Sequence, residues 1–275
     1  MASPSGRAVE ILRARDQYET ARFDRFVGID YSGAEVPTQG LTGLQVYEAC
    51  PGEEPHKVTN PAGTGRRWTR RHIAHWLAEE VAGRARLLVG IDHAFSLPDS
   101  YLQRHGIRDW PRFLDDFCEH WPTDEDNTYV EFLMRANPRT GTADEFRLTE
   151  RWTSSAKSVF QFSGQGTVAY STHAGIPWLR FLRRHDKLQG RLHFWPFDGM
   201  EPPADVSVIA EVYPAVFKNR YPADKRNPHE HDAYATARWM EECQRRSILD
   251  RYFSPPLVLP EQALARREGW ILGIA

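Results

Sequence analysis

The stretch Phe26-Val27-Gly28-Ile29-Asp30-Tyr31-Ser32-Gly33 decides the fold that this sequence predicts. Its first four residues are apolar or small without interruption, and Ser32-Gly33 is a turn signal, so the run predicts a strand buried on both faces. Asp30 then falls at the carboxyl end of that strand, the edge at which an α/β sheet opens toward ligands. The phrase recurs as Leu87-Leu88-Val89-Gly90-Ile91-Asp92, which predicts a second strand of the same design. Two neighbouring strands built alike would place Asp30 and Asp92 side by side.

Each of these two aspartates has a plainer explanation when it is taken alone, because an aspartate often caps the turn that follows a strand. Both, however, stand at the end of the same tetrapeptide, Val-Gly-Ile-Asp. We therefore interpret Asp30 and Asp92 as members of one site at a shared edge of the sheet.

Two more carboxylates follow the same design. Glu211 comes after the apolar run Val208-Ile209-Ala210, in a predicted strand that Pro214 ends because proline cannot donate to a sheet. Asp232 lies near the start of a predicted helix for which Asn227 is a suitable N-cap. The plainer alternatives are a Glu211 that faces outward and an Asp232 that only complements the helix dipole.

Carboxylates gathered in this way are typical ligands of hard divalent cations. Three at strand ends and one at a helix start would hold one or two Mg²⁺ or Mn²⁺ ions, which prefer oxygen ligands and keep several waters. Two such ions about 4 Å apart clamp the attacking and leaving oxygens of a phosphodiester displacement. The sequence does not indicate a zinc site, because His229 and His231 point to different faces of their predicted helix.

Length and composition bound the class of protein. With 275 residues, of which 41% are hydrophobic, the chain can bury a sizeable core as one large domain or two small ones. A formal net charge of −2 gives no overall attraction to nucleic acid or to an anionic membrane. The three cysteines are far apart and odd in number, which favours a reducing compartment, and no segment approaches the roughly 18 apolar residues of a membrane span. We therefore expect a cytoplasmic protein that does not cross a membrane.

The order of the predicted elements indicates an α/β fold with a mixed sheet flanked by helices. Residues 1–23 predict a polar N-terminal arm, and residues 24–275 predict a single domain. Within that domain, about residues 97–190 are rich in aromatic and charged residues and contain no predicted buried strand. We expect this segment to be a helical insertion before the last core strand, with helices near residues 110–121, 128–136 and 168–184.

One short basic segment has the composition of a contact to a phosphate backbone. Arg66-Arg67-Trp68-Thr69-Arg70-Arg71 combines four guanidinium groups with an aromatic ring. Arg66, Arg67, Arg70 and Arg71 are therefore candidate nucleic-acid-binding residues, although such a run is more often the solvated start of a helix.

Taken in order, the motifs resemble those of a known family over about residues 24–275. They are the first Gly-Ile-Asp strand and four further phrases: Val89-Gly-Ile-Asp-His-Ala-Phe-Ser-Leu-Pro98, Glu211-Val-Tyr-Pro214, His229-x-x-Asp-Ala233 and Glu268-Gly-Trp-Ile271. This set is similar to the uncharacterised family of predicted RNase H-like nucleases known as domain of unknown function 429. The resemblance implies an RNase H-like fold with a carboxylate cluster that binds Mg²⁺. By position it implies that Asp30, Asp92 and Asp232 are metal ligands, and it matches Glu211 to a family glutamate of less certain role.

One departure from the pattern concerns His229. Related resolvase-type nucleases often have a second acid three residues before the helix aspartate, and here His229 occupies that position. Its imidazole is a candidate for moving a proton or for replacing a metal ligand, and His93 is a second candidate for proton transfer.

The motifs and the resemblance together predict divalent-metal-dependent hydrolysis of phosphodiesters in a nucleic acid. The predicted catalytic residues are Asp30, Asp92, Asp232, Glu211 and His229. Two alternatives stay open. One is a non-catalytic RNase H-like domain that binds nucleic acid or protein. The other is an actin-like ATP-dependent phosphotransferase, which would need two such domains and a glycine-rich adenosine site.

Overall fold

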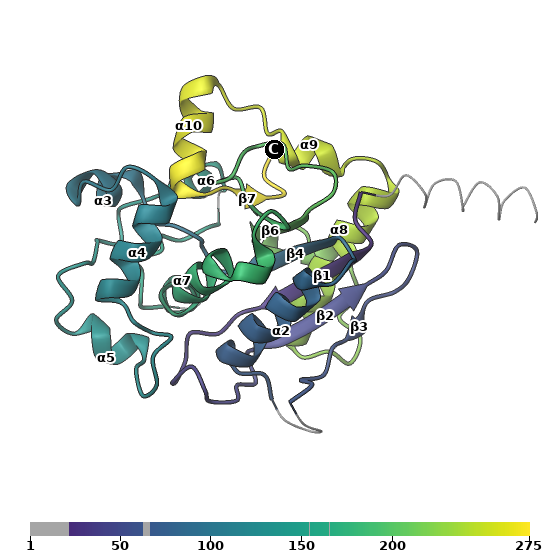
Figure 1. Cartoon of the computed structure of the whole chain (residues 1–275), viewed down its shortest axis with the longest axis horizontal. Coiled ribbons are helices and arrows are strands. Elements are labelled where there is room, and N and C mark those ends of the chain that lie inside the picture. The colour runs from purple at the N-terminus through teal and green to yellow at the C-terminus, as the bar shows by residue number, and fades with distance from the viewer. Residues whose placement is uncertain (1–21, 63–66, 154, 165) are drawn as a thin grey trace, which may run out of the picture.

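A mixed seven-stranded sheet forms the centre of the computed structural model, which describes residues 22–62, 67–153, 155–164 and 166–275 (Figure 1). The strand order is β3-β2-β1-β4-β6-β5, and β7 also pairs with β6. Strands β1, β4, β6, β5 and β7 are parallel where they pair, whereas β2 is antiparallel to both β1 and β3. The strands are β1 (Arg25–Asp30), β2 (Gln45–Ala49), β3 (His56–Lys57), β4 (Leu87–Asp92), β5 (Leu192–Trp195), β6 (Ser207–Val212) and β7 (Ile271–Leu272).

Helices cover both faces of this sheet, so the predicted α/β class with a mixed sheet flanked by helices is confirmed. The helices of the described residues are α2 (Arg70–Ala82), α3 (Asp99–Arg104), α4 (Trp110–His120), α5 (Val130–Met134), α6 (Leu148–Trp152), α7 (Ala169–Arg184), α8 (Pro228–Arg245), α9 (Leu249–Phe253) and α10 (Leu259–Glu268). The segment at residues 97–190 contains helices α3 to α7 and, in its described part, no strand, as the sequence predicts; it precedes three strands of the sheet, β5, β6 and β7, and not only the last one. Helices α4 and α5 pack beside α7, away from β2 and β3 (Figure 1).

Side chains alternate between two cores because successive residues of a strand point to opposite faces. On one face, Val27 and Ile29 of β1 share a core with α2, α4 and α7. On the other face, Phe26 of β1 and Leu88 of β4 share a core with α8. Asp30 is four residues after Phe26, so its side chain emerges on the face that α8 covers.

The N-terminal boundary differs from the expected one by at least one residue. Phe23, which the sequence assigns to a polar arm, is fully buried, and its backbone N–H donates to Gln244 Oε1 at 2.8 Å. Residues 1–21 of the predicted arm lie outside the described residues. Within the described ranges, none of the helices combines the length and the hydropathy that crossing a bilayer requires.

The repeated glycines explain where α8 lies. Gly28 of β1 and Gly90 of β4 are paired in register, and the backbone of α8 crosses the sheet over them. A Cβ on Gly28 would lie 2.8 Å from Thr236 Cβ and 2.7 Å from the amide nitrogen of Ala237, and closer still to the carbonyl oxygen of Ala233. A Cβ on Gly90 would lie 2.8 Å from Thr236 Cγ2. The two glycines therefore let a helix approach the sheet more closely than any side chain would permit.

A methyl group at Gly28 should disrupt this contact. We expect Gly28→Ala to lower the free energy of unfolding by about 3 kcal/mol, because the atoms it meets belong to the helix backbone and cannot rotate away. Urea denaturation followed by circular dichroism measures the change. Gly106→Ala is the control, because its added Cβ would meet no atom within 4 Å. Its left-handed backbone (φ +65°) alone should lower the free energy of unfolding, by about 1 kcal/mol. Equal losses in the two variants would contradict the tight contact.

Candidate metal centre

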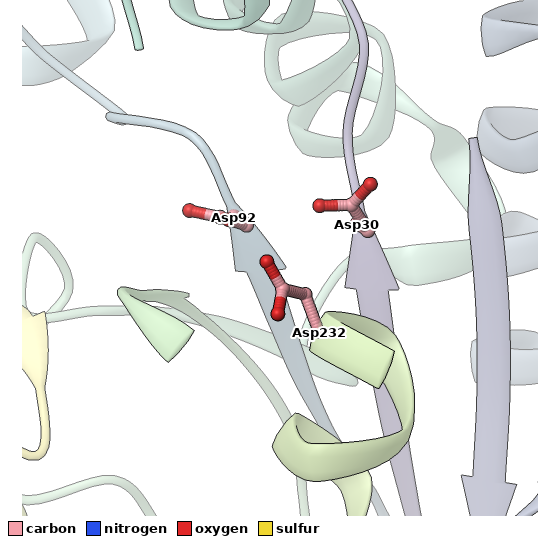
Figure 2. Close-up of side chains that lie close together, drawn as sticks. All are labelled: Asp30, Asp92 and Asp232. Atoms are coloured by element: carbon pink, nitrogen blue, oxygen red, sulfur yellow. The ribbon is translucent and has the colours of Figure 1, made fainter. Parts of the chain in front are cut away.

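Three aspartates meet where β1, β4 and α8 come together (Figure 2). Asp30 ends β1, Asp92 ends β4, and the two are paired in the parallel register, which confirms that they lie side by side. Asp232 projects toward them from the start of α8 (Figure 2). Each aspartate has one carboxylate oxygen within 4.8 Å of those of the other two. The aspartates thus form one cluster at the edge that the sequence predicts.

Local features of α8 bring Asp232 to this point. Asn227 caps the helix by accepting from the backbone N–H of Glu230, whose side chain accepts in turn from the N–H of Asn227. Pro228 is the first helical residue, where its missing N–H costs nothing. Asp232 is thus not needed as a cap. Because Ala233 and Thr236 lie against Gly28, Asp232 is placed at the end of β1 and not above the middle of the strand.

Burial makes the ionised form of this cluster costly. Asp30 is 6% exposed, and removal from water raises its pKa to about 6, although the hydrogen bond with His229 opposes the rise. For Asp92, burial raises the pKa well above its usual range, and the charges of Asp30 and Asp232 raise it further. Carboxylates this close disfavour one another's ionisation, and a cation between them would relieve the repulsion.

Two cationic side chains border the cluster. His229 Nδ1 lies 2.8 Å from Asp30 Oδ2, and this hydrogen bond raises the pKa of His229. The ammonium group of Lys218 lies 2.9 Å from Asp232. Lys218 is a site residue that the sequence did not reveal, because it is in an unremarkable loop 14 positions before its partner. The proton-transfer role of His229 stays a prediction, now with Asp30 as its direct partner.

Glu211 is engaged elsewhere. Its two carboxylate oxygens accept from the guanidinium group of Arg147 at 2.6 and 2.7 Å, and Arg147 is 1% exposed. Arg147 also bonds Glu150 at 2.9 Å, which ties α6 to the end of β6. The prediction that Glu211 completes the metal shell is therefore corrected: it is a buried ion-pair partner outside the group of three aspartates. The expected outward-facing alternative is also wrong, since Glu211 is 4% exposed.

His93 follows Asp92 but is fully enclosed. Its ring is 1% exposed, its Nδ1 lies 2.8 Å from the carbonyl oxygen of Ala94, and burial lowers its pKa to about 4. A neutral imidazole packed against Tyr31 is consistent with a structural role.

The basic segment at residues 66–71 does not form a continuous surface. Arg70 is 1% exposed, and its guanidinium donates to the backbone carbonyls of Ser32, Ala34 and Glu35. Its predicted contact with nucleic acid is thus wrong, and it holds the loop that leaves Asp30 instead. Arg71 pairs with Asp126, Arg67 is exposed, and Arg66 lies outside the described residues.

Two cavities are lined by residues of the cluster or by the loop that follows Asp30. One of about 440 Å³ is lined by the loop from Tyr31 to Glu35, directly after Asp30, and by Tyr129 and Tyr170 of the insertion. The other, of about 30 Å³, is lined by Asp92 together with Arg147 and Glu211 and has room for about one water. Of the three aspartates, Asp92 lines the smaller cavity, and none of them lines the larger one.

The donors of the cluster fit a hard divalent cation. The Oδ1 atom of Asp232 is buried and has the ammonium group of Lys218 2.9 Å away, and no described residue donates a hydrogen bond to Asp92. Carboxylate oxygens are the ligands that Mg²⁺ and Mn²⁺ prefer, and here they come from three separate elements. Asp30, Asp92 and Asp232 are the residues that would hold the ion.

Comparison of the chain with protein-family models, with curated proteins and with solved structures gives no match.

The raised pKa of Asp30 predicts a stability that depends on pH. The pKa of this carboxyl rises from 3.8 to about 6 on folding, so the folded state holds its proton more tightly than the unfolded state. The resulting stabilisation is fully present below pH 3.8 and is lost as the pH rises through 6. In EDTA, we expect Asp30→Asn to exceed the wild type by about 3 kcal/mol in free energy of unfolding at pH 7.5, and by much less at pH 4.5. Urea titrations at both pH values measure the difference. Asp205→Asn, at an exposed position, is the control and should change little at either pH. An Asp30→Asn variant less stable than the wild type at pH 7.5 would show that the ionised carboxylate supports the fold.

Proposed function

We propose that the chain is a divalent-metal-dependent phosphodiesterase that acts on nucleic acid, with Asp30, Asp92 and Asp232 as its metal ligands. The single observation that carries the proposal is the meeting of three carboxylates, from two neighbouring strand ends and one helix start, within 4.8 Å. When bound, a Mg²⁺ or Mn²⁺ ion supplies Lewis-acid stabilisation of a phosphoryl oxygen and activation of a water.

The remaining roles belong to side chains of the chain itself. Asp30 accepts from His229, which fixes the imidazole at the edge of the cluster. The His229 side chain is 54% exposed, so its ring can exchange a proton with a leaving group or with solvent. Arg70 holds the loop that follows Asp30 through three backbone carbonyls, and this loop lines the larger cavity.

We also propose that the fold is RNase H-like. The ordered motifs that resemble the predicted RNase H-like nucleases support this, as does a mixed sheet with acids at the ends of its two central parallel strands. The choice of nucleic acid as the substrate rests on the same resemblance. Three free cysteines support a cytoplasmic location.

Loss of one carboxylate should abolish cleavage. With Mn²⁺ or Mg²⁺, we expect the wild type to cleave at least one member of a panel of single-stranded, double-stranded, hybrid and branched substrates. Asp92→Asn should reduce the rate roughly a hundredfold or more, because a ligand is lost. Asp205→Asn, which removes a similar charge from an exposed position, should retain the wild-type rate. Equal cleavage by all three proteins would indicate a contaminant. No cleavage of any substrate, with intact Mn²⁺ binding, would favour a binding domain.

The ion should also stabilise the fold by mass action. At a concentration a hundred times its dissociation constant, Mn²⁺ should add about 2.7 kcal/mol to the free energy of unfolding of the wild type. Asp232→Asn should gain much less, since it lacks one of the three ligands. Thermal melts with EDTA and with Mn²⁺ measure both gains. An equal response in the two proteins would place the binding of the ion elsewhere.

A further inference from the structure

Lys218 supplies a positive charge to the cluster from the segment between β6 and α8. Its Nζ lies 2.9 Å from both carboxylate oxygens of Asp232, and it hydrogen-bonds Oδ2 while Oδ1 keeps no donor. Its charge also lowers the pKa of Asp30 and of Asp92, so it is within electrostatic reach of the whole cluster.

The backbone at Lys218 is anchored, whereas its side chain is free to move. The preceding residue, Phe217, is 2% exposed and stacks flat on Trp239 of α8, with ring centroids 4.6 Å apart and planes 5° apart. This contact fixes the backbone at Lys218 beside α8. The lysine side chain itself is 32% exposed and has a flexible four-carbon stem, so its ammonium group can leave Asp232 without any change in the backbone.

A purely structural role explains this pair poorly. The start of α8 is already capped by Asn227 and Glu230, so Asp232 does not need Lys218 to satisfy the helix. A partly exposed ion pair of this kind contributes little to stability. The two cations at the cluster contact Asp232 and Asp30, whereas Asp92 has no cationic partner among the described residues.

From these contacts we infer that Lys218 and a divalent cation compete for Asp232, and that Lys218 moves to a phosphate oxygen of the substrate when the cation binds. The inference rests on the proposed function. A cation bound to Asp232 and an ammonium group 2.9 Å from the same carboxylate repel each other, so each weakens the binding of the other. The released ammonium group then lies at the edge of the site, where it can stabilise the charge that develops on a phosphoryl group.

Mn²⁺ binding to two neutral variants of one segment tests the competition. Isothermal titration at pH 7.5 should show that Lys218→Met binds Mn²⁺ about fivefold more tightly than the wild type. Lys225→Met is the matched control, because it removes the same charge from an exposed position seven residues away and should bind within twofold of the wild type. Lys218→Arg keeps the charge and should bind Mn²⁺ like the wild type.

The outcomes separate this inference from the proposed function. Equal or weaker Mn²⁺ binding by Lys218→Met than by Lys225→Met would overturn the competition. Tighter binding by Lys218→Arg to the same extent as by Lys218→Met would also overturn it. No Mn²⁺ binding by the wild type would overturn the proposed function as well. At saturating Mn²⁺, Lys218→Met should lose at least tenfold in kcat for the cleaved substrate, and a full kcat would overturn the transfer to phosphate.

Discussion

A Cβ at Gly28 would overlap the backbone of α8, and a Cβ at Gly90 would overlap the side chain of Thr236, so the acidic cluster depends on the close contact that these glycines permit. The two glycines are paired across neighbouring parallel strands, so together they form a flat place on which one helix can lie. The same strands end two residues later in Asp30 and Asp92. The repeat Val-Gly-Ile-Asp therefore has one physical meaning in both strands: its glycine receives the helix and its aspartate faces the start of that helix.

The cluster has more carboxylates than basic partners. Three carboxylates have two basic neighbours, His229 and Lys218, and both of these side chains are partly exposed. Asp92, the member without such a partner, has the pKa that burial raises most clearly. By contrast, the acid of the next strand, Glu211, forms a two-bond ion pair with the buried Arg147, which it shares with Glu150. Three neighbouring parallel strands thus end in or near a carboxylate. Those of β1 and β4 belong to the cluster, whereas that of β6 is bound to a guanidinium group. Sites that carry such unrelieved repulsion are typically functional.

Local sequence patterns predicted the helices and strands. They did not predict side-chain contacts between residues that are distant in the sequence. Uninterrupted apolar runs identified β1, β4 and β6, and the signals around Asn227 identified the start of α8, because each depends on neighbouring residues. The pairing of Asp30 with Asp92 also followed, since identical strands share a register. The ion pair of Glu211 could not be predicted in this way, because its partner Arg147 lies 64 positions earlier, within the insertion. Arg70 was predicted to be a surface residue for the same reason. The carbonyls that accept hydrogen bonds from its guanidinium group belong to a loop more than 30 positions earlier.

The position of α8 in the chain also decides when the cluster can exist. His229, at the start of α8, lies 199 positions after its partner Asp30. During synthesis on the ribosome, β1 and β4 are complete while α8 is still to be made, and Gly28 and Gly90 then have no helix above them. A nascent chain of that length holds two of the three aspartates and leaves an apolar sheet face uncovered. Both the third aspartate and the residues that cover Gly28 belong to α8, so docking of this helix completes the cluster and covers that face together.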